Sequence, residues 1–438
     1  MSHFSAQLLA PGGFAIGNFE KPFTGSESRL SPIDSMELRS LATAGKRWTK
    51  SSRIVIYKSY LDRKVNILLH LRLGIRPKAI RMPLPVDSEL DAPLRIRLHK
   101  IWSALAKDDF DRFLIACAVG VFPRSFLEAF SVNHTVLEPT LCRTGDIVFT
   151  SNGFDGDDMF QLFTAQSVEN GAKYIAGQHG NNYCSSRHFY SQDELAKTTD
   201  YFLTWGARGI GENSVAAFNF KYPAKKVSSE PTGPILILLH RPPAPIFMWD
   251  RYKEDEIYLE SIRDMLERLD RVGGSNVIVR FHKSFGYYGG DTASLAWDFP
   301  RFMWDDGNQR LTNISKKCSL IIHTYHSTGI LDTLNQDIPT LVFWPCGWEL
   351  SDEAQNDYWE LEAVGILHHR VDSLLREIKE VNKEPEGWWK DAARVEVVRS
   401  FCDRYSRQSS QPTKHLSQIL KNAMIDSADH RSPCFGKG

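Results

Sequence analysis

The sequence predicts an α/β protein with two Rossmann-like domains that face a central cleft. Short runs of β-branched and aliphatic residues alternate with longer amphipathic segments, which is typical of βα units in a mainly parallel sheet. This alternation occurs twice, once on each side of a polar segment at 221–234. The length of 438 residues also favours two domains, because a single hydrophobic core stops growing beyond ~250–300 residues.

The first series predicts an N-terminal Rossmann-like domain over residues 51–225. Residues 1–50, rich in Gly, Ser and Pro, show little periodicity and are expected to be loosely ordered. A helix-like segment covers 158–171. The short runs that we interpret as strand-like lie at 53–57, 111–120, 146–153 and 172–180.

The second series predicts a C-terminal Rossmann-like domain over residues 232–390, after a linker in which polar residues replace apolar ones. Its strand-like runs lie at 235–240, 276–282, 319–327 and 338–344, with helical patterns at 255–270 and 328–336. Residues 391–425 are predicted to form one or two amphipathic helices. A C-terminal helix that crosses back to the first domain suits this arrangement.

Composition excludes several classes of protein. Lys plus Arg and Asp plus Glu are both 53, which argues against a duplex nucleic acid partner. The seven cysteines are scattered without a CxxC spacing, so neither a disulfide framework nor a zinc site is indicated, and a reducing cytoplasm fits best. No window approaches the ~20 apolar residues that span a bilayer, and no standard signal peptide is recognisable.

The strongest local signal is the turn His326-Ser327-Thr328-Gly329, where a predicted strand ends and a helix begins. Unpaired N–H groups and a partial positive charge at a helix N-terminus attract anions, and Gly329 allows close approach of the backbone. These features predict a phosphate site. The alternative is that Ser327 or Thr328 only caps the helix, and the pattern favours neither reading.

A second signal is the group Arg280, His282 and Lys283, which follows a β-branched run. Ligands of open α/β sheets bind beyond the carboxyl ends of the strands, so this turn and the His326 turn are expected to face one crevice. We interpret the three side chains as an anion clamp. A solvated basic turn is the alternative.

The third signal is Gln178-His179-Gly180, a loop after a strand in the first domain. A His in a glycine-flanked loop is positioned for contact with a ligand, and its intrinsic pKa suits general acid or base catalysis. We therefore predict catalytic roles for His179 and Gln178. A purely structural role is the less favoured alternative.

Carboxylates give a weaker signal. Asp155, Asp157 and Asp158 could form a metal site or a catalytic base, but an N-cap with its first helical turn is the favoured reading. No acidic motif is placed convincingly for a metal, so we predict neither metal nor cofactor. Acidic residues that the sequence cannot rank are Glu169, Asp200, Asp332 and Glu349. Aromatic residues that could stack on a base or sugar are Trp205, Trp344 and Trp348.

Taken together, GAKYIAGQHGNNY, DYFLTWGA, HSTGILDTLNQDIPTLVFWPCGWEL and DYWELEAVGIL resemble a family of bacterial transferases associated with surface-polysaccharide biosynthesis. The resemblance covers roughly 145–210 and 275–400. It implies a GT-B architecture and, more loosely, kinship with transferases that use CMP-activated ulosonic acids such as 3-deoxy-manno-octulosonic acid. Its QHG turn falls on Gln178, His179 and Gly180, and its polar turn on His326, Ser327 and Thr328.

This chain departs from that family at two places. Asn181 stands where a second glycine is usual, and the N-terminal part is shorter, so the acceptor-binding half is expected to be reduced or altered.

The leading hypothesis is a metal-independent glycosyltransferase that passes a sugar from a nucleotide donor to a glycan or lipid-linked acceptor. Such an enzyme is expected in the cytoplasm, with peripheral association at the inner face of the membrane as one option. The alternatives are a sugar-nucleotide epimerase, a polyol-phosphate transferase, or a catalytically silent protein that binds a glycan or nucleotide.

Overall fold

The structure is a computed structural model, which we describe for residues 54–75, 81–221, 230–240, 248–272, 276–282, 292–309 and 311–429. The predicted N-terminal segment 1–50 lies outside these residues, as do Lys283 and the central part of the predicted linker.

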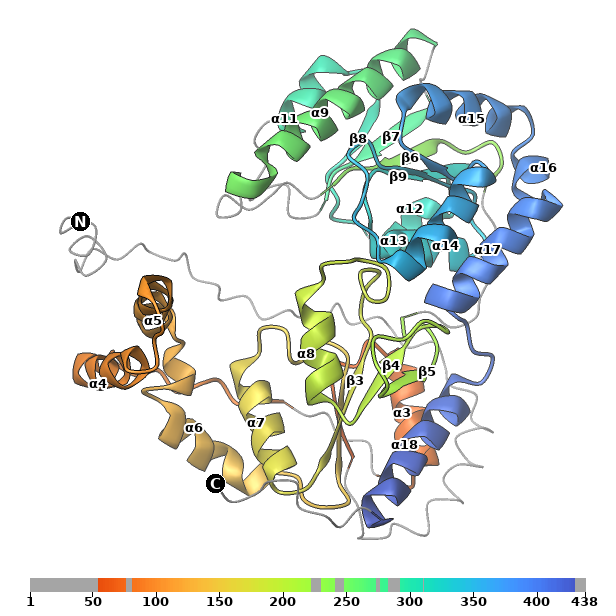
Figure 1. The fold of residues 1–438 in the computed structure, drawn as a ribbon. Helices are drawn as coiled ribbons and strands as arrows, with labels where there is room; N and C mark the ends of the chain where they lie inside the picture. Colours follow the sequence, from red (N-terminus) through yellow and green to blue (C-terminus); the bar gives the residue numbers. More distant parts are fainter. Residues whose placement is uncertain are drawn as a thin grey trace. The chain divides into compact units, whose positions relative to one another are not determined.

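The N-terminal half is built on a parallel sheet whose five strands run in chain order, β1-β2-β3-β4-β5. These strands are Ile54–Tyr57, Ile147–Thr150, Lys173–Gly177, Tyr201–Thr204 and Ser214–Ala216. The apolar runs of β2 and β3 are buried, as expected for parallel strands covered on both faces. Its helices are α3 (Arg63–Arg72), α7 (Asp158–Glu169) and α8 (Tyr190–Thr198), with α3 on one face and α7 and α8 on the other (Figure 1).

The connection from β1 to β2 is helical, which corrects the interpretation of 111–120 as a strand-like run. After α3, it contains α4 (Ala92–Ser103), α5 (Asp109–Val121), α6 (Phe130–Leu137) and the short turns Arg124–Phe126 and Glu138–Thr140. Periodicity alone does not distinguish a short apolar run in a strand from one in a helix. The helix is fixed at its ends: Asp108 caps its first turn, and Arg95 donates to the carbonyls of Val119, Gly120 and Phe122 at its last.

The C-terminal half is built on a six-stranded parallel sheet in the order β11-β10-β9-β6-β7-β8. The strands, from β6 to β11, are Ile235–Leu238, Val277–Arg280, Met303–Asp305, Leu320–His323, Thr340–Phe343 and Leu367–His368. This is the Rossmann order, in which the chain reverses direction across the sheet between its first and fourth strands, here β6 and β9.

Alternate residues of β6 enter different cores. Ile235 and Ile237 belong to one apolar cluster, which includes Ile262 and Leu295, and Leu236 and Leu238 belong to another, which includes Ile321. The helices of this half are α9 (Met248–Arg271), α11 (Thr292–Asp298), α12 (Leu311–Ser315), α13 (Thr328–Asn335), α14 (Asp352–Ala363), α15 (Val371–Lys383) and α16 (Pro385–Trp389).

The last two helices connect the halves. Helix α17 (Ala392–Tyr405) packs on α13 and α14, whereas α18 (Pro412–Asp429) packs on α3 and β3 of the N-terminal half. Ser406, between them, accepts a hydrogen bond at Oγ from Asn219 Nδ2, 2.8 Å away. The predicted GT-B-like arrangement of two parallel α/β units with a C-terminal helix crossing back is therefore confirmed.

Candidate functional site

Two adjoining pockets lie at the carboxyl ends of the C-terminal strands and share Tyr325 and His326, which follow β9. One, of about 680 Å³, extends over His240, Trp344 and Trp348, which follow β6 and β10. The other, of about 740 Å³, is closed on its far side by residues of the N-terminal half, including His179. Since β6 and β9 flank the reversal in strand order, this is where an open α/β sheet binds its ligands.

A larger cavity of about 880 Å³ lies elsewhere, at the amino ends of the same strands, next to Ile235, Val277 and Ser319. The remaining lining comes mainly from α9 and α15. Because ligands of such sheets bind at the opposite, carboxyl edge, size alone does not make this cavity the site.

The floor of the site is fixed by hydrogen bonds between β6 and β9. The Tyr258 hydroxyl accepts from the His240 backbone N–H at 2.8 Å and lies 2.7 Å from Thr324 Oγ1. Thr324 Oγ1 donates to the Leu238 carbonyl at 2.7 Å. Burial raises the pKa of Tyr258, so this hydroxyl stays protonated at physiological pH.

The predicted phosphate turn is found at the N-terminus of α13. Ser327 occupies the N-cap position, but its side chain makes no capping hydrogen bond and instead lies 3.2 Å from His323 Nδ1. Thr328 Oγ1 accepts a 3.2 Å hydrogen bond from the backbone N–H of Asn181. The capping alternative therefore does not describe what these hydroxyls do. Gly329 is needed for packing, because a Cβ there would lie 2.7 Å from the His323 ring.

His326, predicted to bind the nucleotide sugar, lines both pockets but is only 5% exposed. Its Nδ1 lies 2.9 Å from Asn182 Oδ1, and its Nε2 lies 3.0 Å from the Tyr358 hydroxyl and 3.1 Å from Asn181 Nδ2. Burial lowers the pKa of His326 to about 3, and that of His323 likewise to about 3. Both rings are therefore neutral at physiological pH, and His326 provides no positive charge for a phosphate. Its hydrogen bonds to Asn181 and Asn182 instead join the two halves.

Gln178 is a positioning residue in this structure. Its side chain is buried, accepts from the Trp205 backbone N–H at 2.7 Å and donates to the Gly180 carbonyl at 2.9 Å. These bonds fix the turn that carries His179. Gly180 lines the pocket beside Thr328, and a Cβ at this position would lie 3.4 Å from Thr328 Oγ1.

The His179 ring lines the pocket among the rings of Tyr60, Phe154 and Tyr183. Its Nδ1 lies 3.1 Å from the Tyr183 hydroxyl. Burial lowers the pKa of His179 below its ordinary value, while the charge of Asp155 and a backbone hydrogen bond with Ser151 act in the opposite direction. His179 is thus neutral near pH 7 and able to accept a proton.

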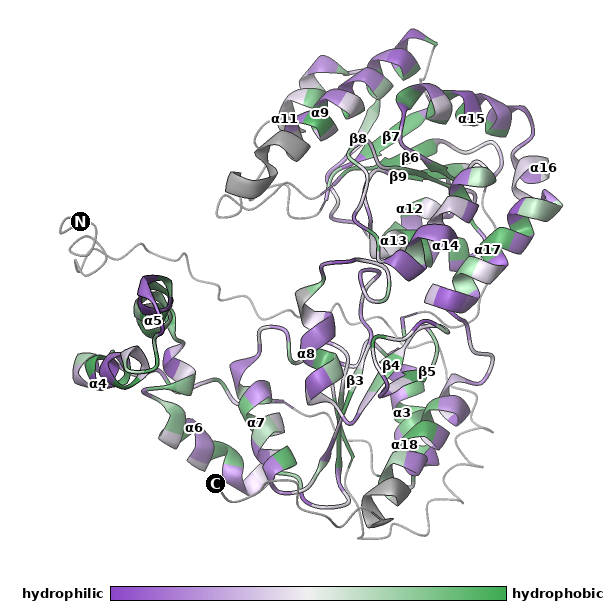
Figure 2. Ribbon diagram, in the orientation of Figure 1, coloured by the Kyte–Doolittle hydropathy of each residue, from purple (hydrophilic) through white to green (hydrophobic). Residues whose placement is uncertain are grey.

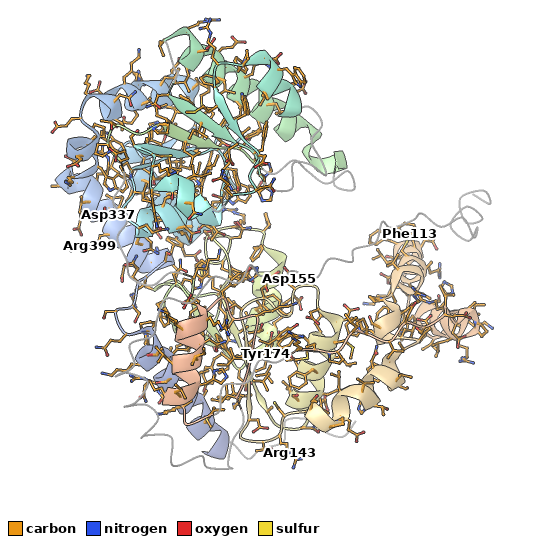
Figure 3. All side chains as sticks on the ribbon, turned by 180° about the vertical axis from the view of Figure 1, so that it is seen from behind. Phe113, Arg143, Asp155, Tyr174, Asp337 and Arg399 are labelled. Atoms are coloured by element: carbon orange, nitrogen blue, oxygen red, sulfur yellow. The ribbon has the colours of Figure 1, made fainter. Side chains whose placement is uncertain are left out.

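The acidic cluster divides into different roles. Asp157 is the N-cap of α7, as favoured from the sequence, and accepts from the Phe160 N–H at 3.1 Å and from Tyr57 Oη at 2.6 Å. Asp158 accepts from Ser125 Oγ. Asp155, by contrast, is exposed and lines the same pocket as His179, and Figure 3 shows it above the N-terminal sheet.

Arg280 and His282 of the basic group after β7 lie among the described residues, and both line one pocket. Arg280 is buried, pairs with Asp305 and donates to the carbonyls of Gly307, at 2.9 Å, and Gln309, which fixes the segment after β8. The pocket that Arg280 and His282 share has a volume of about 360 Å³, and His282 also lines the pocket of His179. Lys283 lies outside the described residues.

The three tryptophans differ in environment. Trp205 is fully buried in the core, so it is not a stacking residue of the site. Trp348 is 36% exposed, stacks on His326 with ring centroids 4.7 Å apart and donates to Ser186 Oγ at 3.0 Å. Trp344 lines the pocket while 3% exposed, and within the described residues its buried Nε1 has no hydrogen-bond partner.

Sequence reasoning did not identify several residues of the site, among them Tyr60, Asn182, Tyr183, Lys221, His323 and Tyr325. Asn181, which stands where a second glycine is usual in the family pattern, joins the two halves through its side chain. Of the acidic residues that the sequence could not rank, Asp332 lines the pocket of His179, and Glu349 lines the adjoining pocket of Trp344. Asp200 pairs with Lys173, and Glu169 is exposed at the end of α7.

The described residues hold no group of three or more His, Cys, Asp or Glu side chains arranged to bind a metal ion. None of the helices in that part of the chain is both long and apolar enough to cross a bilayer.

A family model described as "LIC12162 family transferase" matches residues 24–420. No curated protein matches the chain significantly. Among solved structures, a glycosyltransferase from Rickettsia africae is similar at 9% identity, with a TM-score of 0.39 over 86% of this chain and 91% of that chain. Acinetobacter baumannii MurG is similar at 12% identity, with a TM-score of 0.34 over 68% of this chain and 79% of that chain. The spinosyn rhamnosyltransferase SpnG complexed with thymidine diphosphate is similar at 11% identity, with a TM-score of 0.39 over 85% of this chain and 99% of that chain.

Proposed function

Because the chain belongs to the LIC12162 family of transferases, we propose that it transfers a sugar from a nucleotide-activated donor to a surface-glycan or lipid-linked acceptor. The observation that carries this proposal is the position of the pocket. It lies at the reversal in strand order of the C-terminal sheet and is faced by a neutral histidine from the N-terminal half.

The donor binds on the C-terminal side. The N-terminus of α13, with the hydroxyls of Ser327 and Thr328, offers donors and a partial positive charge to the phosphates. Trp348 presents a ring on which a base or sugar stacks, and Trp344 Nε1 is a buried donor in need of an acceptor. A nucleotide supplies phosphate, ring and acceptor atoms together.

The sugar meets its acceptor beside His179. The acceptor hydroxyl attacks the anomeric carbon, the bond to the donor phosphate breaks, and neutral His179 accepts the hydroxyl proton. The Asp155 charge favours the resulting imidazolium. Lys221, which lines the same pocket, adds a positive charge suited to an anionic sugar, and this supports a CMP-ulosonic acid as the donor.

The test is a thermal-shift screen of the full chain against CMP, UDP, GDP and CDP, because a ligand of the native state raises the melting temperature by mass action. One nucleotide should stabilise the wild type, and Trp348→Ala should weaken this effect. Trp297→Ala, which changes an 86% exposed residue on α11, is the matched control. If none of the four binds, or if both variants behave alike, the donor site is wrong.

Turnover separates an enzyme from a silent binding protein. The matching nucleotide sugar should be slowly hydrolysed without acceptor and transferred when acceptor is added. Binding with release of the unchanged nucleotide sugar under both conditions would favour the silent alternative, and turnover without acceptor to an isomerised donor would favour an epimerase.

A further inference from the structure

Helices α4 and α5 expose an apolar surface that the site does not use. Figure 2 shows hydrophobic residues along α5, and Phe113 of this helix is labelled in Figure 3. We call this surface the α4–α5 face. Its large exposed side chains are Ile96, Ile101, Leu105, Phe110, Phe113, Leu114 and Val121.

The exposed residues of α5 form a stripe. Phe110, Phe113, Leu114 and Val121 recur at helical spacing on one side, and the buried Val119 lies on the opposite side. Phe113 and Phe110 are 61% and 65% exposed. A helix of a globular protein normally turns such a stripe toward the core, so here the apolar side points outward.

The two helices are held firmly in this arrangement. Arg95 on α4, only 7% exposed, pairs with Glu128 at 2.7 Å and donates to three carbonyls at the end of α5. The orientation of α5 is therefore set by a buried network of hydrogen bonds. Its exposed stripe is a fixed feature of the surface.

The charges beside the stripe indicate its partner. Residues 92–107 include Arg95, Arg97, Lys100 and Lys107 and no Asp or Glu. Arg97, Lys100 and Lys107 are exposed. By helical spacing, Arg97 and Lys100 lie between Ile96 and Ile101 on the exposed side of α4.

Acidic residues lie at the N-terminal ends of both helices. Asp91 caps α4 and the exposed Glu89 stands two residues before it, while Asp108, Asp109 and Asp111 lie at the cap and first turn of α5, where Asp109 pairs with Arg112. Residues 113–122 carry no charge at all. The surface thus combines the uncharged apolar part of α5 with a basic helix, the composition of a segment that lies in the interface of an anionic bilayer. Two-fold pairing of this face with itself would bring the two basic helices together.

We propose that the α4–α5 face docks on membranes that contain anionic lipids. Phe113 and Leu114 enter the boundary between headgroups and acyl chains, and Arg97 and Lys100 contact lipid phosphates. This binding is peripheral, and it does not depend on the reaction proposed for the pocket.

Vesicle flotation of the full chain tests the proposal, with vesicles of phosphatidylcholine alone and of an equimolar mixture with phosphatidylglycerol. The wild type should float with the mixed vesicles, and raised salt should weaken this binding. Phe113→Asp with Leu114→Asp should reduce partitioning by at least about tenfold on both kinds of vesicle. Arg97→Glu with Lys100→Glu should cause a comparable loss on mixed vesicles only.

The matched control is Val272→Asp with Trp297→Asp, which changes two other exposed apolar residues, 69% and 86% exposed, and should bind as the wild type does. Circular dichroism checks that each variant is folded. Wild-type protein that stays with neither kind of vesicle would overturn the proposal, as would equal losses in the control. A dimer detected by light scattering and abolished by Phe113→Asp would show that a second copy covers this face instead.

Discussion

The two sheets of this protein differ in how they contribute to the pocket. In the C-terminal sheet the strand order reverses between β6 and β9, so the segments that follow these strands diverge and leave a crevice. In the N-terminal sheet the strands follow chain order without a reversal, and the pocket is lined mainly by loops that follow its strands. One half therefore offers a ligand cavity and the other covers it.

The chemistry of the two sides differs in the same way. His323 and His326 on the C-terminal side are buried and neutral, and the hydroxyls beside them are already oriented. On the N-terminal side, His179 can accept a proton, and the charge of Asp155 favours its protonated form. Changes on the N-terminal side should thus affect turnover, and changes on the C-terminal side should affect donor binding or stability.

The largest effect is expected for His179→Ala. Loss of general base catalysis should lower the single-turnover rate at saturating donor by ~10²–10⁴-fold, with nucleotide affinity nearly unchanged. Rapid-quench transfer assays measure the rate, and calorimetry measures the affinity. A rate within a few-fold of wild type would make His179 a structural residue and remove the functional contrast between the two sides.

Arg280→Ala should mainly destabilise the fold. Removing one partner of a buried ion pair typically costs ~3–5 kcal/mol, because Asp305 is left without its charge partner and two carbonyls lose their donor. Urea unfolding measures this loss, and Arg301→Ala, which removes a 74% exposed side chain of a surface ion pair, is the control. If the variant had wild-type stability but weakened nucleotide binding, the result would support Arg280 as part of an anion clamp and contradict a structural role.

Ser327→Ala combined with Thr328→Ala should weaken nucleotide binding by roughly tenfold, because each hydroxyl is expected to support a hydrogen bond to phosphate. The rate at saturating donor should change little. Ser351→Ala serves as control, since Ser351 is a true side-chain cap, of α14, and its loss should lower stability alone. Equal nucleotide affinity in the two folded variants would exclude this turn from the donor site.

The smallest effect is expected in the pH profile of Asp155→Asn. As general base, His179 must be neutral, so kcat/KM should rise with pH through the pKa of His179, which burial holds below its ordinary value. The Asp155 charge raises this pKa, and its removal should therefore move the acidic limb of the profile to lower pH. A limb that moves to higher pH, or is unchanged, would contradict the proposed coupling of the two residues.

Local pattern was sufficient for most of the fold. Buried strands such as Ile147–Thr150 and Leu320–His323 are continuous apolar runs bounded by polar turns, and this holds whatever packs against them. The capping role of Asp157 was predictable for the same reason, because a cap bonds to the backbone only three residues away. The segment 111–120 was predicted wrongly because a short apolar run has no period that separates strand from helix.

The sequence by itself thus determined two α/β units, the crossing C-terminal helix and the turns around His179 and His326. Only the tertiary structure decided which side chains in those turns face a ligand. Gln178 and Arg280 are both polar residues at strand ends, but the backbone groups that hold them include those of Trp205, Gly307 and Gln309, which lie 27 to 29 positions away in the chain. Asp155 lines the pocket, whereas Asp157 and Asp158 bond to Tyr57 and Ser125. Contacts between residues far apart in the chain decide these roles, and no local pattern contains them.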